Sequence, residues 1–375
     1  MNFKLSKNEF YKYLQIVAKA VSPNSPVPSL CGIHMNVESD AITLTGSDAD
    51  ISIQIKLSNA MNEKLNLNVI ETGSIVIDSR YLLDIVRKLD SDEVQIEIID
   101  GTLTRFFGGK AEFKINGYRP TDYPSIDFSV PDTHFVMNAN DFSKMIENTV
   151  FATSTKETRP VLTGVNLVSD GTRLVATATD SYRLAKKEYP IQCEEFNITV
   201  PSKSLNEIRS IFNNNEDLTV AISTKKLQVF NEYILIQSRL LEGGYPETER
   251  LIPKDFEHVL VINRSDFIRA IDRSSFIKTD NMTIIRLQIN DLNDITLTNK
   301  SQEIGESNEE LTGLSYDGTP LDISFTGNYV MDAAKALNSE NIKISFTTEM
   351  KPFILQNEGE DEGILQLVLP VRTYN

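Results

Sequence analysis

The chain has 375 residues, of which 40% are hydrophobic and 24% charged, which excludes wholesale disorder. At about 100–200 residues per domain, this length leaves room for two to four domains. The formal net charge of −16 argues against nucleic-acid binding through bulk positive charge. There is no secretory signal, no membrane-spanning apolar stretch and no disulfide framework, since only Cys31 and Cys193 are present, so we expect a cytoplasmic protein without a membrane partner.

Along the chain, short β-like apolar runs alternate with segments that have the apolar spacing of amphipathic helices. Residues 3–17 (FKLSKNEFYKYLQIV) are the first example: a polar residue suited to cap a helix follows the run, and Phe10 and Leu14 then stand four residues apart. Alternating β-branched runs follow each such segment. The sequence predicts helices at residues 7–19, 79–89, 140–151, 202–212, 264–276 and 328–337.

These elements recur with a single long period. Phe10, Phe142 and Phe267 hold the same place in three segments, at offsets of 132 and 125 residues. A second set of landmarks at residues 82, 205 and 330 has offsets of 123 and 125. This period is far longer than that of a solenoid or propeller repeat. The sequence therefore predicts an α+β protein of three duplicated domains, at residues 1–128, 129–253 and 254–375, each made of two strand-helix-strands units with antiparallel sheets.

Charge is distributed unevenly over the predicted elements. The six predicted helices carry thirteen basic and eight acidic residues, a balance of +5 that leaves −21 for the rest of the chain. The acidic excess gathers in predicted loops such as residues 302–310 and 357–363. If the helices share one side of their sheets, that side suits a polyanion. Solvated helix faces with scattered charge explain the same count, so both interpretations stay open.

Four motifs stand out in the order of the chain: ETRPVLTGV at residues 157–165, ATDSYRLA at 178–185, LEGGYPETERLIP at 241–253 and LVLPVR at 367–372. Together with the repeat, they resemble the bacterial sliding clamps, the β subunits of DNA polymerase III. The resemblance covers the whole chain. It implies the DNA clamp fold, with helices on an inner face and antiparallel sheets outside, in a ring-shaped homodimer through which duplex DNA passes.

The resemblance also implies a processivity factor that is not an enzyme and needs no cofactor or metal. Its partners would be the α subunit of the replicative polymerase, the clamp loader, and other polymerases and repair proteins, which bind through short linear peptides. Head-to-tail association of two subunits must close into a ring. The positions that match the dimer contact are Phe113, Phe276 and Ile277.

A hydrophobic groove between the second and third domains would capture those peptides. By motif, the groove comprises Leu162, Thr179, Ser181, Tyr182, Arg183, Leu184, Pro246, Arg250, Leu251, Met350, Pro352, Leu367, Leu369, Pro370, Val371 and Arg372. Leucine and methionine give an adaptable apolar surface, and arginine can meet a peptide carbonyl or carboxylate. The DNA-facing candidates are Lys12, Arg80, Lys156, Arg159 and Lys203.

Two departures from the family pattern bear on these sites. Ser181 and Tyr182 stand where the family often has Gly and His, which predicts a bulkier groove edge with a different peptide preference. Asn24 stands nearest the position at which some members place an arginine that touches DNA.

The sequence contains no nucleotide-binding or hydrolase fingerprint. Asp48 and Asp50 resemble a DxD metal motif, but the repeat matches them to the turn at residues 180–182, which favours a turn-shaping role. Three hypotheses follow. The preferred one is a processivity clamp, the second is a peptide-binding adaptor of the same fold that does not encircle DNA, and the third is a metal-dependent hydrolase.

Overall fold

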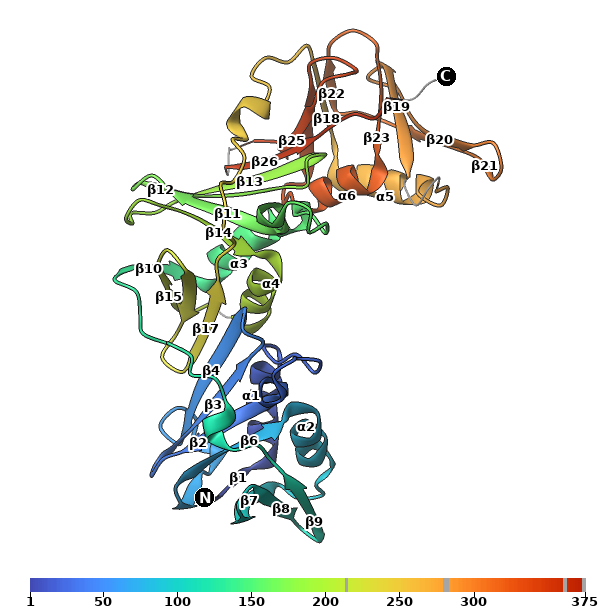
Figure 1. Cartoon of the computed structure of the whole chain (residues 1–375). Helices are drawn as coiled ribbons and strands as arrows, with labels where there is room; N and C mark the ends of the chain where they lie inside the picture. The colour runs from blue at the N-terminus through green and yellow to red at the C-terminus, as the bar shows by residue number, and fades with distance from the viewer. Residues whose placement is uncertain (213–214, 279–282, 360–362, 373–375) are drawn as a thin grey trace. The chain divides into compact units, whose positions relative to one another are not determined.

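The structure is a computed structural model that describes residues 1–212, 215–278, 283–359 and 363–372 (Figure 1). Its contacts divide the chain into two compact units. Unit 1 consists of Met1–Asn140 and Glu207–Leu240, and unit 2 consists of Asp141–Asn206 and Leu241–Asn375. Each unit has its own sheets, helices and hydrophobic core.

One pattern, a strand followed by a helix and three antiparallel strands, recurs six times in the described residues. The first two copies are β1 (Asn2–Ser6), α1 (Lys7–Ala18), β2 (Gly32–Val37), β3 (Ala41–Ser47) and β4 (Ile51–Ser58), then β6 (Gly73–Asp78), α2 (Ser79–Lys88), β7 (Glu93–Asp100), β8 (Leu103–Gly108) and β9 (Ala111–Asn116). The next two are β10 (Thr133–Asn138), α3 (Ala139–Glu147), β11 (Gly164–Ser169), β12 (Arg173–Thr179) and β13 (Arg183–Pro190), then β14 (Phe196–Pro201), α4 (Ser202–Ile211), β15 (Asp217–Ile222), β16 (Lys226–Phe230) and β17 (Ile234–Arg239). The last two are β18 (His258–Asn263), α5 (Arg264–Ser274), β19 (Ile284–Asp291), β20 (Asp294–Ser301) and β21 (Gly305–Leu311), then β23 (Leu321–Thr326), α6 (Gly327–Lys335), β24 (Asn341–Phe346), β25 (Phe353–Asn357) and β26 (Ile364–Val368). Two short strands, β5 (Asn68–Glu71) and β22 (Ser315–Asp317), add to this pattern.

All six predicted helices are present, and each begins within one residue of its predicted start. Asp78 caps α2 by accepting the Arg80 N–H at 3.0 Å, and Asn263 caps α5 in the same way. The largest error is at α3, which ends four residues before its predicted end. There Thr149 has φ −128°, outside the helical region, and its hydroxyl donates to the Met145 carbonyl at 2.8 Å.

Two sheets organise the strands of each unit. Unit 1 has a five-stranded sheet in the order β5-β1-β7-β8-β9 and an eight-stranded sheet in the order β10-β15-β16-β17-β4-β3-β2-β6. Unit 2 has a four-stranded sheet in the order β21-β20-β19-β23 and a nine-stranded sheet in the order β14-β11-β12-β13-β26-β25-β24-β18-β22. The two long sheets each combine strands from two neighbouring predicted domains.

Each long sheet contains an antiparallel joint between the last strands of two copies of the repeated pattern. Joint 1 pairs β4 with β17, from Ile51↔Ser238 to Ile55↔Ile234. Joint 2 pairs β13 with β26, from Arg183↔Val368 to Lys187↔Ile364. Both joints use the same register, because the first residue of β17 or β26 lies opposite the fifth residue of its partner strand.

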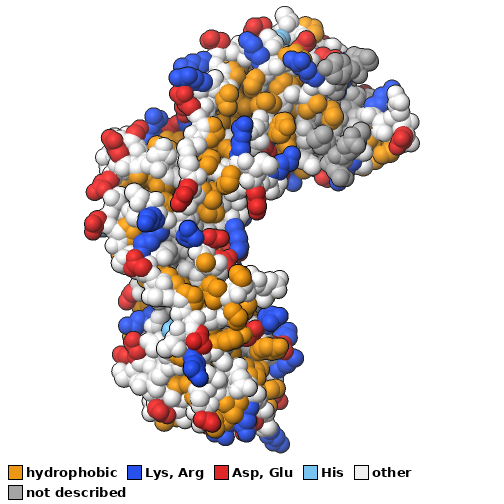
Figure 2. Space-filling view, viewed as in Figure 1, with side chains coloured by type: hydrophobic (Ala, Val, Ile, Leu, Met, Phe, Trp, Pro, Cys, Tyr) orange, Lys and Arg blue, Asp and Glu red, His pale blue; other side chains and the backbone are white. Residues whose placement is uncertain are grey.

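One of the two acidic segments predicted as loops is not a loop. The prediction that residues 302–310 form a loop is wrong, because residues 305–311 form β21, an edge strand. Its sequence, GESNEEL, lacks the β-branched alternation that indicates a strand. Of the other predicted loop, residues 360–362 lie outside the described part of the chain. Figure 2 shows charged side chains of both signs spread over the viewed face of each unit.

The described residues contain no helix long and apolar enough to cross a membrane.

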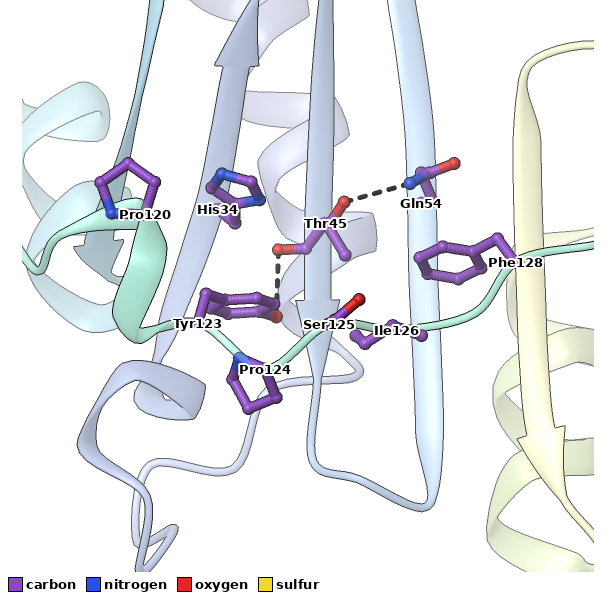
Figure 3. A pocket seen from close by; sticks show the side chains of 9 residues that line it. All are labelled: His34, Thr45, Gln54, Pro120, Tyr123, Pro124, Ser125, Ile126 and Phe128. Atoms are coloured by element: carbon purple, nitrogen blue, oxygen red, sulfur yellow. Dashed lines mark hydrogen bonds between the residues drawn. The ribbon is translucent and has the colours of Figure 1, made fainter.

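The segment that joins β9 to β10 lies across β2, β3 and β4 (Figure 3). Tyr123 stacks on His34 with ring centroids 5.3 Å apart, and its hydroxyl donates to the Thr45 carbonyl at 3.4 Å. Burial lowers the pKa of His34 and raises that of Tyr123. Further along, Lys226 of β16 donates to the Asp127 carbonyl at 2.8 Å. The segment therefore contacts both halves of joint 1.

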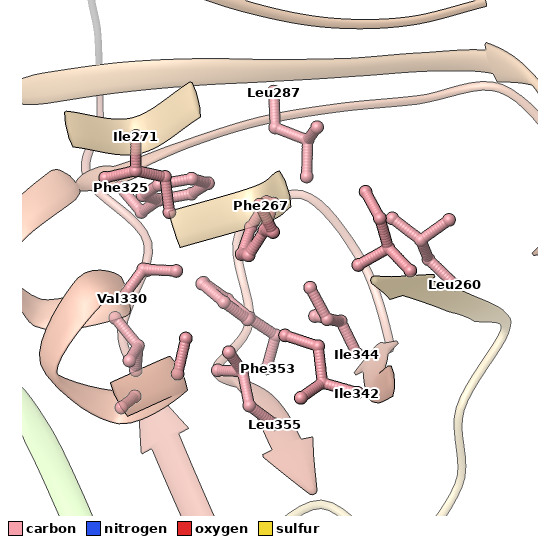
Figure 4. Packing of buried hydrophobic residues seen from close by; sticks show 14 of the residues in the cluster. Leu260, Phe267, Ile271, Leu287, Phe325, Val330, Ile342, Ile344, Phe353 and Leu355 are labelled. Atoms are coloured by element: carbon pink, nitrogen blue, oxygen red, sulfur yellow. The ribbon is translucent and has the colours of Figure 1, made fainter. Parts of the chain in front are cut away.

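In unit 2, α5 and α6 lie side by side and supply one layer of a large core (Figure 1). The four-residue spacing of Phe267 and Ile271 places both on the buried face of α5, and Val330 projects from α6 (Figure 4). They meet Phe325 and Phe353 from the sheets, whose ring centroids lie 5.8 Å apart. All five side chains are at most 1% exposed.

Because this core tolerates little loss of volume, we predict that Phe325→Ala lowers the free energy of unfolding by about 3–5 kcal/mol. Leu314, which is 55% exposed in the same unit, is the control, and Leu314→Ala should change it by less than about 0.5 kcal/mol. Urea denaturation measures both. Equal effects of the two substitutions would contradict the assignment of the core.

Candidate functional site

The residues predicted for the peptide groove all lie in unit 2, around joint 2. Leu184 and Leu367 are cross-strand partners in the joint, and both are buried. With Ile354 they form a small apolar cluster against which Leu369 packs. The sequence prediction thus brings together side chains from β13, from β26 and from the segment after it.

The turn between β12 and β13 has an unusual backbone. Ser181 has φ 79°, a left-handed conformation that non-glycine residues rarely adopt. Hydrogen bonds hold it there: the Thr179 hydroxyl accepts the Ser181 N–H at 3.1 Å, and Asp180 accepts the N–H groups of Tyr182 at 2.9 Å and Arg183 at 3.0 Å. The turn is therefore locked by short side chains that precede it.

Joint 1 contains the same turn between β3 and β4. Ala49 also has φ 79°, and Asp48 accepts the N–H groups of Asp50 at 3.1 Å and Ile51 at 2.9 Å. The predicted turn-shaping role of Asp48 is thereby confirmed. No group of three or more His, Cys, Asp or Glu side chains suited to a metal ion occurs among the residues that the structure describes.

Three side chains predicted for the groove are large, apolar and exposed. Tyr182 is 58% exposed, Leu251 is 53% exposed and Met350 is 47% exposed. The ring of Tyr182 stacks on Tyr329 of α6, with centroids 6.5 Å apart and an angle of 24° between the rings. Figure 2 shows hydrophobic side chains on the viewed face of this unit. Such exposed apolar side chains are typical of a surface that binds a partner.

Arg183 is the most heavily engaged charged residue of the predicted groove. Its side chain is 13% exposed and donates to Asp180 at 3.1 Å, to Asp332 of α6 at 2.7 Å and to the Phe151 carbonyl at 2.6 Å. Its guanidinium carbon lies 4.5 Å from the ring centroid of Tyr329. Through these contacts, the Arg183 side chain connects the turn to α6.

The remaining arginines of the groove are more accessible than Arg183. Arg250 has an 81% exposed side chain, paired with Glu247 at 3.3 Å. Arg372 is exposed near the end of the described chain. An incoming peptide can reach these two guanidinium groups.

Sequence reasoning missed two tyrosines of the site. The Tyr245 hydroxyl accepts the Thr179 N–H at 3.0 Å, and burial raises the pKa of this tyrosine. Tyr329 stacks on Tyr182, and burial raises its pKa as well. Tyr245 could have been found, because a Tyr-Pro pair also begins the preceding interdomain segment at Tyr123. Tyr329 could not, because only the fold brings α6 to this turn.

The residues predicted for the dimer contact differ in exposure. Phe276 is 63% exposed, whereas Ile277 is fully buried at 0%. Phe113 is half-buried in the middle of β9, an edge strand. The segment that carries Phe276 is anchored by Asn299 of β20, which donates to the carbonyls of Ser274 and Ile277 at 2.9 Å each.

The cations predicted to face DNA are exposed. Arg80 and Lys203 are the second residues of α2 and α4, so they hold equivalent places in the repeat. Arg80 is 61% exposed although it pairs with Asp78 at 3.1 Å. Lys12, on α1, and Lys156 and Arg159, between α3 and β11, are exposed, as is Asn24.

Comparison with known proteins identifies the family. Family models described as the N-terminal, central and C-terminal domains of the DNA polymerase III beta subunit match residues 1–127, 136–247 and 249–372. The chain is 37% identical to the Bacillus subtilis beta sliding clamp and 36% identical to that of Staphylococcus aureus, covering all of both chains in each comparison. The crystal structure of the Bacillus subtilis clamp matches it with a TM-score of 0.95 at 36% identity over 100% of both chains. A Streptococcus pneumoniae beta chain matches with a TM-score of 0.95 at 32% identity, covering 99% of this chain and 100% of that one.

The chain belongs to the bacterial β sliding clamps. The predicted resemblance and the predicted three-domain α+β clamp fold are thereby confirmed. The function of the family follows: the chain is a non-catalytic processivity factor of DNA polymerase III, and its partners are DNA and that polymerase. The hydrolase hypothesis is accordingly set aside.

Because Arg183 is mostly buried and paired, we predict that Arg183→Met destabilises the clamp by about 3–5 kcal/mol, since it leaves the mostly buried Asp180 carboxylate without a positive charge beside it. Arg250→Met is the matched control, and it should change the free energy of unfolding by less than about 0.5 kcal/mol because Arg250 is exposed. Chemical denaturation of both variants decides. An Arg183→Met clamp as stable as the parent would show that stability does not depend on the contacts of Arg183.

Proposed function

We propose that two copies of this clamp join head to tail into a closed ring around duplex DNA, and that the surface at joint 2 tethers the polymerase. The observation that carries the proposal is that two strands at sheet edges have a paired strand on one side only. β21 ends the four-stranded sheet of unit 2, and β9 ends the five-stranded sheet of unit 1.

The repeat explains why these edges complement each other. In each joint, the last strand of the first half of one domain pairs with the last strand of the second half of the next domain. β21 is the counterpart of β4 and β13, and β9 is the counterpart of β17 and β26. Pairing β21 of one copy with β9 of another would make a third joint of the same kind. Because each copy offers both edges, a head-to-tail pair can close.

The register of the existing joints supports the predicted contact residues. Carried over to β9 and β21, it sets Phe113, the third residue of β9, opposite Ser307, the third residue of β21. Ser307 pairs across the sheet with Asn299. Because Asn299 anchors the segment that carries Phe276, both phenylalanines would meet in this third joint.

Charge supports the same pairing. β21 contains Glu306, Glu309 and Glu310 and no basic residue. β9 contains Lys114 and Glu112, and Lys110 directly precedes it. Opposite charges on the two edges favour β9 against β21 over β21 against itself, which is what a head-to-tail arrangement requires.

DNA would pass through the ring along the helices. The predicted helices carry a net +5 while the whole chain carries −16, so a helix-lined hole would attract DNA weakly. Few phosphate contacts permit sliding, and closure of the ring supplies retention. The candidates for these contacts are Lys12, Arg80, Lys156, Arg159 and Lys203.

The polymerase α subunit, the clamp loader and other polymerases or repair proteins would bind as short peptides at joint 2. The support is the exposed apolar border of Tyr182, Leu251 and Met350 above a buried leucine cluster. Exposed arginines beside it can pair with peptide carbonyls or carboxylates. We also retain the domain limits at residues 1–128, 129–253 and 254–375, and a site of action in the bacterial cytoplasm.

To test the ring, we replace Phe276 with Asp. Because Phe276 is exposed and central to the proposed third joint, Phe276→Asp should weaken dimerisation at least about tenfold and give monomers by light scattering. Val136→Asp is the control, since Val136 is 57% exposed on an edge strand outside that joint, and it should remain dimeric. A Phe276→Asp dimer as stable as the parent would refute this interface.

To test the groove, we replace Leu251 with Glu. This residue is exposed, so Leu251→Glu should leave the fold intact while weakening binding of the polymerase α subunit at least about tenfold. Leu314→Glu, at 55% exposure in the same unit, should bind as the parent does. Surface plasmon resonance with immobilised clamp compares them. Unchanged affinity for Leu251→Glu would move the peptide site elsewhere.

A further inference from the structure

Joint 1 has its own cavity, in the place where joint 2 has the groove. The cavity has a volume of about 380 Å³, within the range of small-ligand pockets, and we call it the joint 1 hollow. It lies entirely in unit 1, between β4, β17, the 3₁₀ turn at Pro28–Cys31 and the segment after Tyr123. Figure 3 shows the adjoining cavity, which shares the stretch from Pro124 to Ile126.

The frame of the hollow repeats the frame of joint 2. Arg239 N–H donates to the Asp50 carbonyl at 2.8 Å, as Leu369 N–H donates to the Tyr182 carbonyl at 2.9 Å. Both joints also have a 3₁₀ turn that begins at proline and contains a leucine, Leu30 in the hollow, that is 4% exposed. The two sites therefore share one backbone scaffold.

The side chains on this scaffold differ in chemistry. Ser52 and Gln237 are cross-strand partners in joint 1, at the places of Leu184 and Leu367 in joint 2. Arg239 likewise stands at the place of Leu369. The lining of the hollow thus combines the polar and cationic side chains of Ser52, Gln237 and Arg239 with the apolar side chains of Val27, Leu30 and Ile126.

The charged groups that line the hollow are Arg239 and Asp50. Their nearest atoms lie 3.8 Å apart, beyond hydrogen-bond distance, and their side chains are 68% and 76% exposed. A guanidinium has five N–H donors, so Arg239 can donate two hydrogen bonds to a carboxylate while it stays near Asp50.

We propose that the joint 1 hollow is a second peptide-binding site, which takes an extended segment with an apolar side chain next to an aspartate or glutamate. The apolar side chain packs against Val27, Leu30 and Ile126, and the carboxylate pairs with Arg239. The inference rests on the proposed function, because the peptide-binding role of joint 2 supplies the mode of binding. The two sites would differ in what they select: joint 2 offers the apolar cluster of Leu184, Ile354 and Leu367, whereas the hollow offers Arg239 to a negative charge.

The test uses the full-length dimer with labelled Ile, Leu and Val methyl groups, observed by NMR. The probe is acetyl-Gly-Leu-Asp-Gly-amide at millimolar concentration, and acetyl-Gly-Leu-Asn-Gly-amide is the matched uncharged control. We expect the aspartate probe to shift the methyl signals of Val27, Leu30 and Ile126, and to bind at least about tenfold more tightly than the asparagine probe. Arg239→Gln, a change at an exposed side chain, should remove this difference between the probes.

Absence of shifts at these three residues would overturn the proposal, and so would equal affinity of the two probes. Shifts confined to Leu162, Leu367 and Leu369 would also overturn it, because the probe would then occupy joint 2 alone. That last result leaves the proposed function standing. Failure of the proposed function is recognised separately, by unchanged binding of the polymerase α subunit to Leu251→Glu.

Discussion

Antiparallel pairing between the last strands of two copies of the repeated pattern is the constraint on which the rest of this clamp depends. Joint 1 and joint 2 use one register, and each turns two groups of strands into one long sheet. Backbone hydrogen bonds make such a joint insensitive to sequence, so diverged repeats keep it. The same geometry leaves β9 and β21 as unmatched edges, and an edge strand is a template for a further strand.

Each joint also frames one of the two proposed binding sites. The turn that precedes β4 or β13 carries a non-glycine residue at φ 79°, held by an aspartate and a hydroxyl. This turn presents its next residue, Asp50 or Tyr182, at the border of the joint. On this shared scaffold, Ser52, Gln237 and Arg239 of joint 1 stand where joint 2 has leucines, and we propose that this difference changes what each site binds.

The helices and the repeat were predictable because apolar spacing and polar caps are local signals. Phe267 and Ile271 face the core as their spacing indicates, and α3 shows the largest error in its end because Thr149 leaves the helical region. β21 escaped prediction since GESNEEL carries the composition of a loop, and only its pairing with β20 makes it a strand. The groove residues came from the family resemblance, because residues such as Leu184 and Leu369, which are far apart in the sequence, are brought together only by tertiary structure. For the same reason, the sequence could not show that Ile277 is buried while Phe276 is exposed. Nor could it show that Arg183 connects the turn to α6.

We propose that closure of a ring, and not strong binding, retains this clamp on DNA. Retention on nicked circular DNA and on the same DNA after linearisation tests it most directly, after loading by a cognate clamp loader with ATP. The account predicts that the clamp stays on the circle and slides off the free ends of the linear form. Equally fast loss from both forms by an intact dimer would contradict topological retention, and would favour a peptide-binding adaptor that does not encircle DNA.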